Sequence, residues 1–254
     1  MPLPRDNPWL PFGDGGNGPM LACLPFAGGG ASNFLAWRRA LPGLAIAPVQ
    51  YPGHETRLDE PCATKVDVLL DSLADALVPQ LTGRRYGLLG ISLGAKLAFA
   101  LTPRLQARGL PAPCGLHLIA HRSPLLSPRV TGVWRLDETR FRAHIRAYGG
   151  TPDEVFDTPE LAEVILPILR ADLALSEQLV ATDPVDSPIH AYCGDADPVA
   201  TPADMAGWQH LTRGQFHLEV FPGGHFFARQ CSSFLPALAR DAAGWTAGPA
   251  VPAG

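Results

Sequence analysis

The sequence of 254 residues has little of several features that mark particular classes of protein. It contains only two lysines, and charged residues make up 17% of the chain, with a formal net charge of −4. A chain without an excess of basic residues lacks the electrostatic surface that nucleic acids and anionic membranes attract. No uninterrupted apolar run reaches the ~18 residues that a membrane-spanning helix needs. We therefore expect neither nucleic acid nor a membrane among its partners.

Cysteines are also few: the chain has five, at scattered positions and without a Cys-x-x-Cys pair. This pattern suggests neither a zinc site nor a disulfide framework, and favours small buried thiols in a reducing compartment. His117 and His121 have the spacing of a zinc pair, but on the strand expected there they would lie about 13 Å apart. The first eight residues lack a basic start followed by a long apolar stretch, so they do not resemble a signal peptide. We expect a cytoplasmic protein without a metal or other cofactor.

The most informative stretch runs from residue 86 to 98. An apolar, strand-like run leads into Gly90-Ile91-Ser92-Leu93-Gly94, and a segment rich in Ala and Leu follows. Gly-x-Ser-x-Gly between a strand and a helix forms the nucleophile elbow, in which the glycines let strand and helix pass close to a sharply turned serine. Ser92 is therefore the candidate nucleophile.

Strand and helix patterns alternate along most of the chain. Strand signals cover residues 20–26, 44–50, 86–91, 114–120, 189–193 and 216–221, and helix signals cover 33–41, 64–81, 93–107, 202–211 and 227–243. Such alternation indicates parallel strands joined by crossover helices. Together with the elbow, it predicts the α/β-hydrolase fold, with a mostly parallel central sheet flanked by helices.

The alternation breaks between residues 125 and 186, where only helix and loop signals occur, with helices expected over 136–148 and 159–181. An insert of this length exceeds an ordinary connection of about 2–6 residues, so we interpret it as a helical lid over the carboxyl end of the sheet. The predicted organisation is an N-terminal arm (1–19), a core (20–124 and 187–243), the lid (125–186) and a flexible tail (244–254).

A serine hydroxyl needs an imidazole to accept its proton and a carboxylate to orient that imidazole. In this fold the chain order is Ser, then Asp or Glu, then His, each in a loop after a strand. His225 follows the last predicted strand, and Asp197 follows the strand before it. Asp195 is the alternative acid, but we expect it to bind backbone N–H groups instead.

The backbone N–H groups of Ala27 and Leu93 are the expected donors to the oxyanion. Ala27 begins a glycine-rich loop after the first strand, and Leu93 stands at the start of the helix that follows Ser92. Both positions match the oxyanion hole of the fold. His54 and Arg57 follow the second strand; they are candidates to line the site, but we expect them to fix their own loop.

Several further stretches together resemble one family. They are Leu24-Pro25-Phe26-Ala27-Gly28-Gly29, Val49-Gln50-Tyr51-Pro52-Gly53, Gly90 to Ala95, Tyr148-Gly149-Gly150-Thr151-Pro152, Leu166-Pro167-Ile168-Leu169-Arg170-Ala171-Asp172 and Pro222-Gly223-Gly224-His225-Phe226-Phe227. With them the chain resembles the stand-alone type II thioesterases of polyketide and nonribosomal peptide synthesis.

The resemblance implies hydrolysis of acyl groups from the phosphopantetheine arm of acyl or peptidyl carrier proteins, which clears mis-primed or stalled chains. It also implies a Ser92, Asp197 and His225 triad. One residue departs from the family pattern, because Ile91 stands where the family usually has histidine. We interpret Ile91 as packing beneath the elbow.

Two other functions remain open at this level. One is a general esterase or acyl-CoA hydrolase, and the other is a module that keeps the fold and binds acyl groups or carrier proteins without turnover. A monomer is the expected state.

Overall fold

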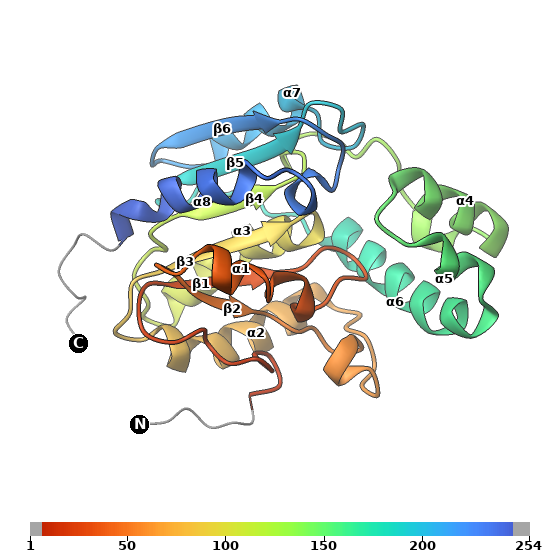
Figure 1. Cartoon of the computed structure of the whole chain (residues 1–254), viewed down its shortest axis with the longest axis horizontal. Helices are drawn as coiled ribbons and strands as arrows, with labels where there is room; N and C mark the ends of the chain where they lie inside the picture. The colour runs from red at the N-terminus through yellow and green to blue at the C-terminus, as the bar shows by residue number, and fades with distance from the viewer. Residues whose placement is uncertain (1–6, 246–254) are drawn as a thin grey trace.

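The computed structural model describes residues 7–245, and the strands in that part of the chain form one six-stranded parallel sheet (Figure 1). The strands are β1 (Met20–Leu24), β2 (Ala45–Pro48), β3 (Tyr86–Ile91), β4 (Leu116–Ile119), β5 (Ile189–Gly194) and β6 (Phe216–Phe221), in the spatial order β2-β1-β3-β4-β5-β6. This is the doubly flanked α/β arrangement that the alternating signals predicted. Because the strands are parallel, the loops that follow β1, β3, β5 and β6 gather at one edge of the sheet.

Helices cover both faces of the sheet (Figure 1). The α-helices are α1 (Trp37–Ala40), α2 (Val66–Leu81), α3 (Leu93–Ala107), α4 (Glu138–Tyr148), α5 (Asp153–Asp157), α6 (Pro159–Gln178), α7 (Pro202–Ala206) and α8 (Phe234–Ala242). Short 3-10 helices occupy Ala31–Phe34, Glu55–Arg57, Val133–Arg135, Gly207–Leu211, Phe227–Arg229 and Ala243–Trp245.

Alternation along β1 shows how the two apolar cores are divided. Met20, Ala22 and Leu24 join the core that contains α2 and α3, whereas Leu21 and Cys23 join the core that contains α1 and α8. Successive side chains of a strand point to opposite faces, so each strand of a covered parallel sheet supplies both layers. α3 is therefore held on one face of the sheet, which fixes where its first turn lies.

The segment interpreted as a lid forms α4, α5 and α6, and the first two lie beyond one end of the sheet (Figure 1). These helices share a small apolar cluster that includes Phe141, Phe156 and Leu166. The carboxyl end of α6 instead reaches the main core, because Leu175 and Leu179 pack with α2 and α3. Helix α6 thus packs both in the small cluster of the lid segment and in the main core.

Some predicted helix boundaries are wrong. The helix expected over 227–243 is two pieces, because the chain leaves the 3-10 helix at Arg229 and starts α8 only at Phe234. Serine side chains compete with helical backbone bonds, and the Ser232-Ser233 pair stands at this break. The helix expected over 202–211 likewise tightens from α7 into a 3-10 helix at Gly207.

Two further differences concern short segments. The helix expected over 33–41 is reduced to α1 after a 3-10 turn, and α5 was not predicted at all. Both α1 and α5 are shorter than the two or three helical turns over which apolar periodicity becomes readable.

The ends of the described chain pack on the core. Trp9 is buried, and the Arg57 guanidinium lies over its ring at 4.6 Å from the centroid. Trp245, in the predicted tail, is buried among the residues that face α8. Residues 1–6 of the predicted arm and 246–254 of the predicted tail lie outside the described residues. No helix within residues 7–245 combines the length and the apolar character needed to cross a membrane.

Candidate active site

Ser92 occupies a strained turn between β3 and α3. Its φ of 52° lies in the left-handed region, which is uncommon for a residue with a side chain and typical of functional turns. The flanking glycines make this turn possible: a Cβ on Gly94 would collide with the Leu24 carbonyl, and one on Gly90 would collide with the Gly94 carbonyl. The Ser92 N–H donates to the Ile119 carbonyl at 2.8 Å, which ties the turn to β4. The sequence-predicted elbow is therefore present.

His225 stands between Ser92 and a buried carboxylate. Its Nε2 lies 3.2 Å from Ser92 Oγ, and its Nδ1 lies 2.9 Å from Asp197 Oδ2. A carboxylate only accepts, so Nδ1 carries a proton and donates it to Asp197. Nε2 of the neutral ring then accepts from the serine hydroxyl, which is the arrangement that general-base activation needs.

Asp197 is held as a charged group despite its burial. Burial raises the pKa of this carboxyl, but its hydrogen bond and electrostatic attraction with the His225 ring, together with two backbone N–H groups, bring the pKa below its usual range. Those N–H groups belong to Val199 and Ala200, at 2.8 and 3.1 Å from Oδ1. The alternative acid, Asp195, accepts instead from the Gly223 N–H at 2.9 Å. The structure thus brings together the three side chains that the sequence singled out, while their catalytic roles stay a prediction.

The two predicted oxyanion donors lie in neighbouring segments. Leu93 is the first residue of α3, where a helix has N–H groups without intrahelical partners. The chain after β1 passes directly beside this helix end, because a Cβ on Gly94 would also meet the Pro25 carbonyl. Ala27 follows two residues later, so the structure places both predicted donors at the carboxyl edge of the sheet with Ser92.

Residues of the lid approach the same place. The Tyr148 ring, at the end of α4, stands edge-on to the His225 ring with centroids 6.3 Å apart. The Phe226 ring stands edge-on to the Phe26 ring at 5.2 Å, and Gly150 has no room for a Cβ because Phe226 lies against it. The aromatic rings of Tyr148 and Phe226 therefore both lie next to the His225 ring.

Sequence reasoning missed a buried contact beside Ala27. Asp172 of α6 accepts hydrogen bonds from the Gly28 N–H at 2.7 Å and from His54 at 2.9 Å. His54 was expected to fix its own loop, and it does bond Pro52 O, but it also reaches the lid. The available signal was the segment Leu169-Arg170-Ala171-Asp172, in which an acidic residue occupies an otherwise apolar helix face.

His117 and His121, which share only the sequence spacing of a zinc pair, have separate hydrogen-bond partners. His117 Nδ1 bonds the Tyr192 hydroxyl at 2.9 Å, and His121 Nδ1 bonds the Arg122 carbonyl at 2.7 Å. Each imidazole is thus held by a hydrogen bond to a neighbour of its own.

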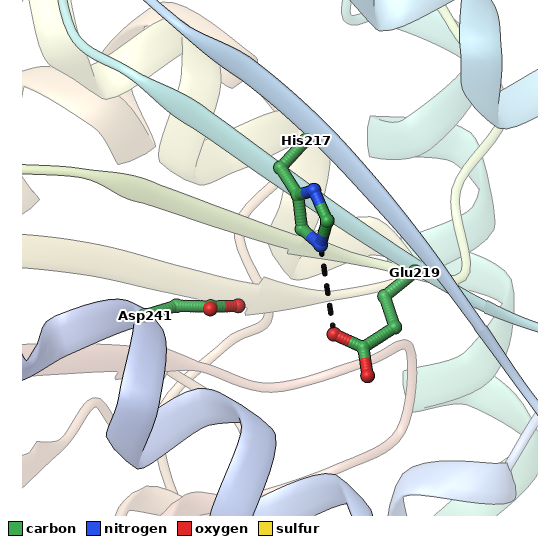
Figure 2. Close-up of side chains that lie close together, drawn as sticks. All are labelled: His217, Glu219 and Asp241. Carbon is green, nitrogen blue, oxygen red and sulfur yellow. Dashed lines mark ion pairs between the residues drawn. The ribbon is translucent and has the colours of Figure 1, made fainter.

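Another group of potential metal ligands lies on β6 and α8. His217, Glu219 and Asp241 have ligand atoms within 4.8 Å of one another, and His217 and Glu219 lie on β6 opposite Asp241 of α8 (Figure 2). However, the Arg240 guanidinium pairs with both carboxylates, so a cation already balances them. His217, on the edge strand β6, is exposed, and we read the group as a surface ion-pair network.

Comparison with known proteins gives consistent results. A family model described as the thioesterase domain matches residues 19–246. The thioesterase PikA5 of Streptomyces venezuelae is 36% identical over 210 residues, which cover 82% of this chain and 74% of PikA5. The gramicidin S biosynthesis protein GrsT of Aneurinibacillus migulanus is 30% identical over 210 residues, with 82% of each chain covered.

Solved structures agree with these relatives. The RedJ thioesterase of the prodiginine pathway in Streptomyces coelicolor superposes with a TM-score of 0.81 at 34% identity, covering 90% of this chain and 95% of RedJ. YbtT, a type II thioesterase of the yersiniabactin pathway, has a TM-score of 0.81 at 28% identity, covering 89% of this chain and 94% of YbtT.

Proposed function

The chain belongs to the thioesterase family, and on that premise we propose that it removes acyl groups from the phosphopantetheine arm of carrier proteins in polyketide or nonribosomal peptide synthesis. The observation that carries the proposal is the hydrogen-bonded chain from Asp197 through His225 to Ser92, beside the end of the lid helix α4. Relatives named for gramicidin S biosynthesis and for the yersiniabactin and prodiginine pathways support the substrate class. Release of mis-primed or stalled chains is the role that follows.

The chemistry proceeds through an acyl-serine. Ser92 Oγ attacks the thioester carbonyl carbon while His225 Nε2 takes the hydroxyl proton, and the N–H groups of Ala27 and Leu93 stabilise the oxyanion. The C–S bond then breaks, and the imidazolium returns its proton to the departing pantetheine sulfur. Water repeats the attack on the acyl-serine with His225 again as base, which releases the carboxylic acid and restores the serine hydroxyl.

A single copy of the chain carries the three side chains of the proposed triad and both proposed oxyanion donors, so we propose that it acts as a monomer. Its proposed macromolecular partner is an acyl or peptidyl carrier protein. All five cysteines are free, which supports the cytoplasm as its compartment.

The test compares three substrates that share one acyl group: a carrier-bound thioester, the acyl-pantetheine thioester and the p-nitrophenyl ester. We expect kcat/KM to be largest for the carrier-bound thioester, because only that substrate offers a protein surface as well as the arm. Equal values for carrier-bound and free thioesters would instead indicate a general esterase or acyl-CoA hydrolase.

A fluorophosphonate probe separates catalysis from binding alone. Wild type should be labelled, Ser92→Ala should not, and Ser72→Ala should behave as wild type because Ser72 is an exposed residue of α2. Absence of labelling in folded wild-type protein would leave a non-catalytic binding module as the better description.

A further inference from the structure

A carboxylate of the lid is buried against the loop that holds Ala27. Asp172 of α6 is 2% exposed, and one of its oxygens, Oδ2, accepts from both the Gly28 N–H at 2.7 Å and His54 Nε2 at 2.9 Å. None of the three groups belongs to the proposed triad. The contact joins segments 144 and 118 residues apart in sequence, so it connects the lid to two loops of the core at once.

The hydrogen bonds of His54 define its charge. Its Nδ1 lies 3.0 Å from the Pro52 carbonyl, which only accepts, so Nδ1 carries a proton. Its Nε2 faces Asp172 Oδ2, which already receives the Gly28 N–H, so Nε2 carries a proton as well. His54 is therefore an imidazolium paired with a carboxylate.

The surroundings of His54 agree with this charge state. Burial lowers the pKa of His54, but the hydrogen bond and charge of Asp172, the Pro52 carbonyl and the charge of Glu55 outweigh it, so the pKa is raised. The other titratable neighbours are the Tyr51 ring, which stands edge-on to His54, and the Cys62 thiol. Burial and the charge of Asp172 raise the pKa of both groups, so they stay neutral beside the ion pair.

The peptide groups on both sides of Ala27 are fixed. The Phe26 carbonyl accepts from the Gly29 N–H at 2.8 Å, which sets the plane of the Phe26–Ala27 peptide. In a trans peptide the N–H points away from the carbonyl, so this bond also directs the Ala27 N–H. The Gly28 N–H bond to Asp172 sets the plane of the next peptide. The Phe26–Ala27 plane is thus fixed by a hydrogen bond within the loop, and the Ala27–Gly28 plane is fixed by a hydrogen bond to the lid.

Close packing reinforces the second contact. Gly28 has a φ of 74°, and a Cβ there would lie 2.6 Å from Cδ2 of Leu169, one turn before Asp172 on α6. The lid helix therefore packs closely against the loop at a position whose backbone conformation favours glycine.

We infer that Asp172 is a positioning residue for the oxyanion hole. Paired with His54, it anchors the Ala27–Gly28 peptide, and through the shared Ala27 Cα it keeps the preceding Phe26–Ala27 peptide, which carries the Ala27 N–H, directed at the developing oxyanion. The inference rests on the proposed function of Ser92 and Ala27. It makes the placement of the Ala27 N–H depend on the position of α6 against the core. Asp172 acts through Gly28 and touches no reacting atom.

Asp172→Asn tests this with little change in shape. The position of Oδ2 would hold either the amide oxygen or the amide nitrogen. Nitrogen cannot accept from Gly28, and oxygen can serve both donors only if His54 stays charged without a counter-ion. Because loss of one oxyanion donor lowers kcat by about 10²–10³-fold, we expect D172N to lose about tenfold or more in kcat, with KM changed less than about threefold.

The second readout is the affinity of an alkyl trifluoromethyl ketone, which serine hydrolases convert into an anionic hemiketal. Its inhibition constant, measured by competition with fluorophosphonate labelling, should rise in D172N by the same factor as kcat falls. This assay needs no carrier protein, so it remains informative even if carrier-bound thioesters are not the substrate. Glu163→Gln, an exposed carboxylate on the same helix, is the control and should change neither value.

Three results would overturn the inference: a folded D172N with wild-type kcat, a change confined to KM, or a lower kcat with unchanged affinity for the ketone. If D172N does not fold, the double variant His54→Gln with Asp172→Asn replaces it, because a neutral amide pair leaves no buried charge unpaired. In that variant the asparagine oxygen can accept from both the introduced glutamine amide and the Gly28 N–H, so we expect kcat within about threefold of wild type. A folded but inactive double variant would contradict the positioning role.

Discussion

At the scale of single residues, two aspartates of one loop have different hydrogen-bond partners, although they are only two positions apart. Asp197 bonds the His225 ring and two N–H groups of its own loop, whereas Asp195 bonds the Gly223 N–H across the sheet edge. Gly223 precedes His225 by two residues, so both aspartates hold the same histidine loop. Only Asp197 touches the imidazole.

Replacing Asp197 by Asn should lower kcat by about 10⁴-fold, because an amide N–H donates to Nδ1 and leaves the proton on Nε2, where it cannot accept from Ser92. The assay is steady-state hydrolysis of an acyl-pantetheine thioester, with circular dichroism to verify folding. Asp195→Asn is the matched control, since its amide oxygen can still accept from Gly223, and it should keep kcat within a few-fold. Similar losses in both variants would mean that loop structure, and not the tautomer of His225, limits the rate.

Ile91, the residue before Ser92, is packed as a core residue. Its side chain is 4% exposed and packs in the core that contains α1 and α8. Ile91→Val should lower the free energy of unfolding by about 0.5–1.5 kcal/mol through the lost methylene, with the relative rates on short and long acyl thioesters unchanged. Denaturant unfolding and a substrate panel measure the two effects. A changed acyl preference at unchanged stability would place Ile91 in the acyl site instead.

At the scale of elements, α6 connects the lid, the core and the site. Its middle carries Asp172, and its last turn receives a hydrogen bond from Lys96 of α3, whose ammonium donates to the Ser176 carbonyl. Carbonyls at the end of a helix lack intrahelical partners, and a cation is favoured there. Helix α3, which follows Ser92, is thereby tied to α6 of the lid.

Burial lowers the pKa of Lys96 to about 8, although the charge of Glu177 opposes the shift. The unfolded chain, with a lysine pKa of about 10.4, binds more protons than the folded one between those values, so stability should rise with pH in that window. Relative to Lys96→Met, wild type should gain on the order of 3 kcal/mol from pH 8 to 10.5. Urea unfolding at several pH values measures this, and Lys65→Met, at an exposed site, should follow wild type. Parallel curves for wild type and K96M would show that Lys96 is not desolvated.

At the scale of the whole molecule, the sequence predicted what depends on local pattern. Alternating apolar runs predicted the sheet and its flanking helices. The elbow motif, the chain order and the place of each residue in a loop after a strand together predicted that Ser92, Asp197 and His225 would meet at one edge. The contact of Asp172 with His54 and Gly28 was not predicted. An acidic residue on an apolar helix face does not indicate which segment, more than 100 residues away, supplies its partner. Short elements such as α5 were not predicted, because they span too few residues to show apolar periodicity.

The division of the lid between two apolar clusters leads to a prediction about its dynamics. α4 and α5 are supported by the small cluster around Phe141 and Phe156, whereas Leu175 and Leu179 anchor the end of α6 in the main core. Segments with fewer buried contacts open at lower free energy, so amide exchange should be fastest in α4 and α5, slower in the last two turns of α6 and slowest in β3. Hydrogen exchange followed by mass spectrometry resolves these segments. If α4 exchanged as slowly as β3, the lid would be a fixed part of the core, and access of an acyl chain to Ser92 would need a route that does not depend on lid opening.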